Sequence, residues 1–75
     1  MSREENNSEL LQLLEAAIQR EIMAAKLYEE SAAKANNEKA KSLLKQLAQE
    51  ERRHRELLRG QYEELAGHAL YEAGE

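Results

Sequence analysis

The stretch from Leu47 to Leu58 reads LAQEERRHRELL and sets polar residues among leucines. One stripe along a helix, at steps of four, three and four, contains Leu47, Glu51, His54 and Leu58. Side chains at positions i and i+3 are neighbours on a helix, so the Glu51 carboxylate and the His54 imidazole can reach one point inside a helical bundle. The pair predicts two metal ligands, but a Glu three residues before a His is a weak signal in a chain so rich in Glu.

Length and composition favour an all-α protein that needs a partner chain. The 75 residues contain no Pro, Trp or Phe and only three Gly, and the commonest residue types are good helix formers. At this length only about 60% of the unfolded chain's surface becomes buried, so a lone monomer is marginally stable. Because the chain has no Cys, any metal must be held by carboxylates and imidazoles.

The charge distribution argues against two classes of partner. A formal net charge of −4 is atypical of nucleic-acid-binding proteins and of proteins that bind anionic membranes, which usually carry a positive face. The basic cluster Arg52, Arg53, Arg55 and Arg59 is interpreted as a solvated helix face, because several glutamates surround it at helical spacing. Neither a long apolar run nor a signal peptide is evident, and we expect a cytoplasmic location.

Apolar periodicity predicts a first helix over residues 8–35. Ser8 is a suitable N-cap. The predicted seam follows steps of three and four and comprises Leu11, Leu14, Ile18, Glu21, Ala25, Tyr28, Ala32 and Ala35. Asn36 and Asn37 then interrupt the pattern, because Asn favours turns and helix caps. A tight turn is expected there.

A second helix is predicted over residues 38–66, antiparallel to the first. Its seam comprises Ala40, Leu44, Leu47, Glu51, His54, Leu58, Gln61 and Leu65. Gly67 is a plausible C-terminal cap, so residues 1–7 and 68–75 are expected to be flexible tails. The predicted architecture is a two-helix hairpin over residues 8–66.

Counting residues from the turn places Glu21 opposite Glu51. Each lies about fifteen residues from the turn, or about 22 Å along its helix, so Glu21, Glu51 and His54 should meet at one level. Two hairpins related by a two-fold axis would form a four-helix bundle. Such a homodimer brings together four carboxylates and two imidazoles, and two divalent cations would balance these charges. Iron or manganese suits this donor set, and zinc could also bind.

The same polar residues have another interpretation. Glu and His in a seam can fix the register of a coiled coil without binding metal, so a metal-free oligomerisation or interaction module is the alternative function. Tyr28 lies one heptad from Glu21 and could donate a hydrogen bond to a metal ligand, but a core tyrosine with a satisfied hydroxyl is at least as consistent with its position.

The pattern Glu21-x6-Tyr28, followed by LAQEERRH with Glu51-x-x-His54, resembles the rubrerythrin-like branch of the ferritin-like superfamily, including the short encapsulated ferritins. The similarity covers about residues 10–65 as half of a usual four-helix domain. It implies a di-iron centre held by Glu21, Glu51 and His54 from two subunits, a ferroxidase that oxidises Fe(II) with O2 or peroxide, and a nearby Tyr28. It also admits a shell protein as partner, with the protein inside a nanocompartment.

Two features depart from the family pattern. Full rubrerythrins carry a second iron centre held by four Cys, whereas this chain has none. Encapsulated ferritins usually end in a targeting peptide rich in small and aliphatic residues, which the final residues Tyr71 to Glu75, YEAGE, do not resemble.

Overall fold

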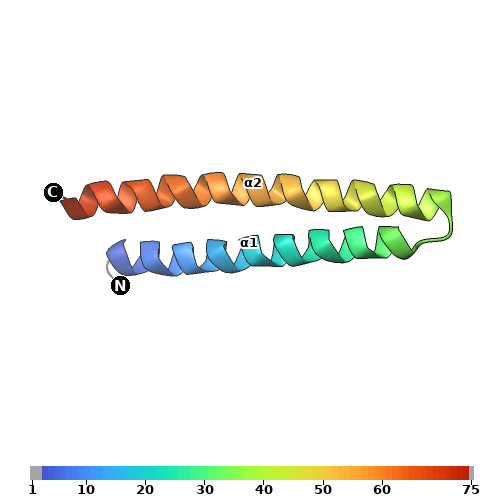
Figure 1. The fold of residues 1–75 in the computed structure, drawn as a ribbon. Coiled ribbons are helices and arrows are strands. Elements are labelled where there is room, and N and C mark those ends of the chain that lie inside the picture. The colour runs from blue at the N-terminus through green and yellow to red at the C-terminus, as the bar shows by residue number, and fades with distance from the viewer. Residues whose placement is uncertain (1–2, 75) are drawn as a thin grey trace.

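The computed structural model describes the backbone of residues 3–74 and the side chains of residues 7–67. It contains helix α1, Arg3–Lys34, and helix α2, Glu38–Gly74. Figure 1 shows the two helices lying side by side and antiparallel, joined by one short connection. The predicted all-α hairpin is confirmed. No helix in the described part of the chain is long and apolar enough to cross a bilayer.

The turn falls where the two asparagines predicted it. Asn37 is the N-cap of α2, because its side-chain oxygen accepts hydrogen bonds from the backbone N–H groups of Lys39 at 2.8 Å and Ala40 at 3.1 Å. Glu38 places a negative charge in the first turn of α2, and Lys34 places a positive charge in the last turn of α1. Both charges suit the helix dipoles.

Both helices extend beyond the predicted ends. Helix α1 begins at Arg3 rather than Ser8, and α2 continues through Gly67 to Gly74. No described glycine has a positive φ, so Gly67 does not form the expected left-handed cap. A chain without Pro contains no strong helix breaker in these segments. Of the predicted tails, residues 1, 2 and 75 lie outside the described residues.

The hairpin is a rod with little core. Its principal extents are 57 × 17 × 13 Å, and among residues 7–67 the buried side chains are those of Ala25, Ala32 and Ala48. Seven large apolar side chains within the same range are exposed: Leu10, Leu13, Ile22, Met23, Leu27, Leu43 and Leu57. Because two helices cannot enclose a core, this distribution is what a half-bundle would have.

The seam of α1 agrees with the prediction, while that of α2 is rotated. All eight seam residues predicted for the first helix are buried or half-buried. On α2, Ala40, His54 and Gln61 are exposed, and their neighbours Lys41, Arg55 and Tyr62 are half-buried instead. Adjacent residues lie 100° apart on a helix, so a stripe read from spacing alone can be displaced by one position.

Candidate metal centre

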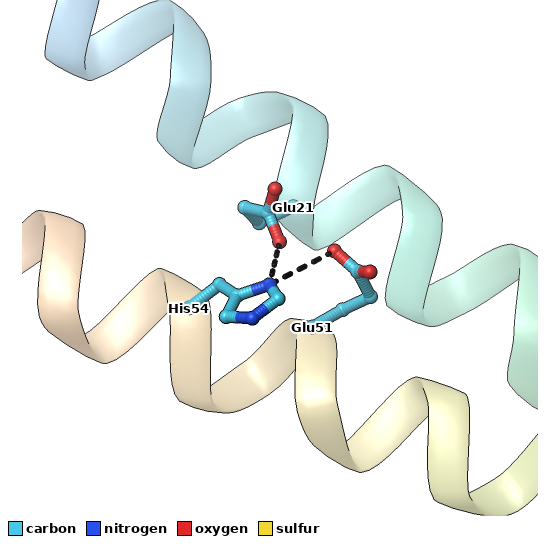
Figure 2. Close-up of polar contacts among 3 residues, drawn as sticks. All are labelled: Glu21, Glu51 and His54. Carbon is cyan, nitrogen blue, oxygen red and sulfur yellow. Dashed lines mark ion pairs between the residues drawn. The ribbon is translucent and has the colours of Figure 1, made fainter.

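Three side chains from the two helices converge midway along the hairpin. Glu21 projects from α1, and Glu51 and His54 project from successive turns of α2 (Figure 2). The Nδ1 atom of His54 lies 3.3 Å from Oε2 of Glu21 and 3.7 Å from Oε2 of Glu51. The structure thus brings together all three residues that the sequence proposed as metal ligands.

The size of the cluster suits a shared cation. One potential ligand atom from each of Glu21, Glu51 and His54 lies within 4.8 Å of the other two. Metal–ligand bonds to carboxylate oxygen and imidazole nitrogen are about 2.0–2.2 Å long, so atoms at this separation could bind one ion after small side-chain movements. Among the described residues this is the one group of three acidic or histidine side chains that meets this criterion.

Burial differs across the cluster. The side chains of Glu21 and Glu51 are 23% and 20% exposed, whereas that of His54 is 54% exposed. The carboxylates therefore lie between the helices of one hairpin, and the imidazole lies at its outer edge. Any further ligand must approach from the side on which His54 is open.

An unsatisfied oxygen marks the centre of the cluster. Oε2 of Glu21 is shielded from solvent and accepts no hydrogen bond, although His54 is within ion-pair distance. A buried carboxylate oxygen without a donor is costly. The cation that this donor set would bind could remove that cost, so the residues present fit a metal ion.

The Glu21 carboxyl group also perturbs that of Glu51. Contact with the Glu21 carboxyl group raises the pKa of Glu51, and desolvation raises it further, while His54 acts in the opposite direction. Two acids at one site cannot both ionise freely without a positive charge between them. A bound divalent cation would supply that charge.

Several other polar side chains lie near the cluster. Tyr28 is half-buried, and within the described residues its hydroxyl makes no hydrogen bond to the three cluster residues. Arg52 pairs with Glu29 across the hairpin, and Glu56 pairs with arginines on its own helix. Arg55 departs from the predicted solvated face, because it is half-buried and its Nε has no hydrogen-bond partner.

The hairpin is long and antiparallel, with Glu on one helix and Glu-x-x-His on the other, which is the ligand pattern of di-iron carboxylate bundles. The Rubrerythrin family model matches residues 12–73 of the chain. The chain therefore belongs to the Rubrerythrin family, whose members have a ferritin-like, iron-binding fold. No curated protein and no solved structure matches the chain.

Proposed function

We propose that two copies of the hairpin assemble into a four-helix bundle that binds two iron ions and oxidises Fe(II) with O2 or peroxide. The observation that carries this proposal is the convergence of Glu21, Glu51 and His54 around a buried oxygen without a hydrogen-bond donor. Membership of the Rubrerythrin family supports iron as the metal. Glu21, Glu51 and His54 are its proposed ligands.

A second copy would complete the site. One hairpin offers three ligand residues, and its His54 is open on one side. Two copies facing each other there would supply four carboxylates and two imidazoles, the inventory that di-iron bundle proteins use. Neither ion would then depend on ligands from a single chain.

The side of the hairpin that would pair is defined by exposed leucines. Each of Leu13, Leu27, Leu43 and Leu57 is at least 55% exposed, and two residues further along the chain stand Glu15, Glu29, Lys45 and Arg59. Residues two apart on a helix point in nearly opposite directions, about 200° apart. One groove joins Glu29 to Lys45, and a second joins Glu15 to Arg59, so these charges share one face.

The leucines therefore share the opposite face, which we call the docking face: Leu13 and Leu27 on α1, with Leu43, His54 and Leu57 on α2. His54 belongs to it because it stands three residues before Leu57, on the same side of α2. Burying a leucine side chain contributes about 1.5–3 kcal/mol. Pairing through the docking face would cover these leucines and the open side of the metal cluster together.

Charge favours one direction of pairing. Residues 22–50, the half nearer the turn, contain five lysines and four glutamates, whereas the remainder contains six arginines and eleven glutamates. Two hairpins in the same direction would bring the acidic open ends together. Opposite directions place each acidic end beside a turn half that is slightly basic, which is the favourable arrangement. We infer that the hairpins run in opposite directions.

Spin labels on an Asn36→Cys variant test this direction by electron paramagnetic resonance. The turn lies about 22 Å from the cluster along the helix, so opposite directions predict about 45 Å between the two labels. Hairpins in the same direction would place the labels within about 20 Å, given interhelical spacings of 8–10 Å. The shorter distance would show that the hairpins run in the same direction. It would not contradict the iron site, because a mid-helix site meets its copy in either direction.

Iron is the substrate in the proposed reaction. Two Fe(II) ions give up two electrons, which with two protons reduce O2 to hydrogen peroxide, or hydrogen peroxide to two molecules of water. Glu21 and Glu51 hold the ions and offset the charge gained on oxidation, and His54 completes the ligand set through the Nδ1 atom that faces both carboxylates. The leucines of the docking face exclude bulk water.

Anaerobic titration of the purified protein with Fe(II) tests the function. We expect saturation near one iron per chain and, after O2 or peroxide is added, conversion to Fe(III) faster than in buffer. Glu51→Ala should abolish saturable binding, whereas Glu30→Ala, which removes an exposed carboxylate outside the cluster, should not. If no saturable binding occurs and Glu51→Ala has no effect, the hairpin is a metal-free interaction module.

A further inference from the structure

The face opposite the docking face carries a groove near the hairpin turn, which we call the lysine groove. It lies between α1 and α2, and its volume is about 610 Å³. Its floor is formed by Ala32, Ala33 and Ala48, and its basic edge by Lys41, Lys45 and Arg52. Because pairing through the docking face leaves the other side open, a bundle of two hairpins would display two such grooves.

The floor of the groove is low because its side chains are small, and Ala33 is the alanine that another chain could contact directly. Ala32 and Ala48 are 3% and 1% exposed, so their side chains fill the space between the helices and do not project into the groove. Ala33 is exposed beside them. Alanine at a helix contact lets a neighbouring main chain approach closely, whereas longer side chains would hold it away.

The edge of the groove is positively charged in a chain whose net charge is −4. At one end Arg52 pairs with Glu29. At the other end, neither Lys41 nor Lys45 takes part in an ion pair within the described residues. Three cations against one carboxylate give the lining a positive charge, and the two lysines retain their capacity to bind an acid.

The spacing of these cations indicates an elongated ligand. Arg52 stands eleven positions after Lys41, so the charges extend over about 16 Å along α2, farther than one phosphate or carboxylate can span. The same distance corresponds to about three turns of a helix. An apolar floor flanked by charges is the arrangement by which grooves between helices bind an amphipathic helix.

We propose that the lysine groove docks a short acidic helix from a partner protein. The helix would set small apolar residues on the alanine floor and Asp or Glu residues opposite Lys41 and Lys45. Charge complementarity with those two lysines is the observation that identifies this occupant. The proposal does not depend on iron binding, because the groove and the metal cluster lie on different sides of the hairpin.

A designed peptide tests the proposal on the full chain. The probe is a fluorescent fifteen-residue helix with Ala on one side and Glu on the other, and the matched probe has Lys in place of Glu. We expect saturable binding of the Glu peptide, weakened by added salt, and no saturable binding of the Lys peptide. Backbone amide shifts in the nuclear magnetic resonance spectrum should concentrate on residues 29–33 and 41–52. Equal binding of both peptides, or shifts confined to the docking face, would overturn the proposal.

Substitutions within the groove sharpen the test. Lys41→Glu with Lys45→Glu should weaken the Glu peptide by about tenfold, since two exposed ion pairs become two repulsions. The control Lys26→Glu with Lys39→Glu makes the same change of charge outside the groove. Ala33→Leu should obstruct the floor and weaken binding without altering the melting temperature, because Ala33 is exposed. If the controls weaken binding equally, or if inorganic phosphate produces the same amide shifts at Lys41 and Lys45, no helix-docking groove exists.

Discussion

The two long faces of this hairpin differ although they are built from the same two helices. The docking face carries Leu13, Leu27, Leu43 and Leu57, and each is followed two residues later by a charged residue of the opposite face. Each helix therefore has an apolar surface and a charged surface on opposite sides, because residues two positions apart point in nearly opposite directions. The proposed dimer would bury the leucine side and leave the charged side open to solvent or to a polar partner.

The candidate metal cluster of Glu21, Glu51 and His54 lies at the edge of the docking face. Glu21 and Glu51 lie between the helices, and His54 extends the cluster toward the leucines. A hairpin that paired through its charged face would leave His54 open. The comparison of the two faces therefore predicts that dimerisation and iron binding are lost together, and the following experiments test this link.

The largest effect is expected when the docking face is made acidic. Leu27→Glu with Leu57→Glu should weaken dimerisation by at least about 100-fold, because four leucine contacts per dimer are lost and each contributes about 1.5–3 kcal/mol. Analytical ultracentrifugation measures the dimer, and Fe(II) titration should show uptake lost in parallel. Lys45→Gln with Arg59→Gln changes the charged face and should alter neither. Dimers that persist in the acidic variant would show that the chains pair elsewhere.

Metal should stabilise the folded protein by a smaller amount. A ligand that binds only the folded state, at one hundred times its dissociation constant, adds about 2.7 kcal/mol of stability. Thermal denaturation with Fe(II), Mn(II) or Zn(II) measures the effect as a rise in melting temperature. His54→Ala should abolish the rise because it removes the ligand at the docking face. Equal rises in the variant and the unaltered protein would exclude His54 as a ligand.

A substitution in the turn should lower the stability of the hairpin without affecting the docking face or the charged face. Asn37→Ala removes the oxygen that caps α2 and should reduce the free energy of unfolding by about 1 kcal/mol. Iron stoichiometry should not change, because the cap touches neither face. Asn36→Ala is the matched control and should stay within about 0.5 kcal/mol. A change in iron stoichiometry would mean that the turn contributes to the site.

The smallest effect concerns pH in the absence of metal. Contact with Glu21 raises the pKa of Glu51 above its ordinary value of 4.5, so the folded state retains a proton that the unfolded state releases. The resulting stability is present below pH 4.5 and is lost as pH rises through the folded pKa. With a chelator present, the unaltered protein should therefore lose stability relative to Glu51→Gln as the pH rises above 4.5. A difference in melting temperature that does not change with pH would contradict the shared proton.

Several features of the fold and site follow from sequence because they depend on counting along a helix. The rise per residue is constant, so the distances of Glu21 and Glu51 from the turn predict that their carboxylates meet. Asn37 predicts the turn through its capping chemistry. These inferences depend on one chain alone and not on the second copy in the proposed dimer.

Other features depend on rotation about the helix axis, which spacing specifies poorly. His54 and Arg55 are adjacent, and the choice of which faces α1 depends on packing against the whole of that helix. The apolar residues of α2 cover both the side that packs against α1 and part of the docking face. A stripe this wide is compatible with two rotations of α2 about its own axis. Spacing along the sequence does not reveal the lysine groove for a related reason, since the groove requires the alanines between the helices to be placed beside Lys41 and Lys45.

The positions of the three buried alanines have a consequence for motion. Ala25, Ala32 and Ala48 all lie between the metal cluster and the turn, so among residues 7–67 the closest packing is in the half nearer the turn. Backbone amides there should exchange with solvent deuterium more slowly than those toward the open ends. The cluster lies at the limit of the tightly packed half, where separation of the open ends would admit an ion while the turn keeps the two helices aligned.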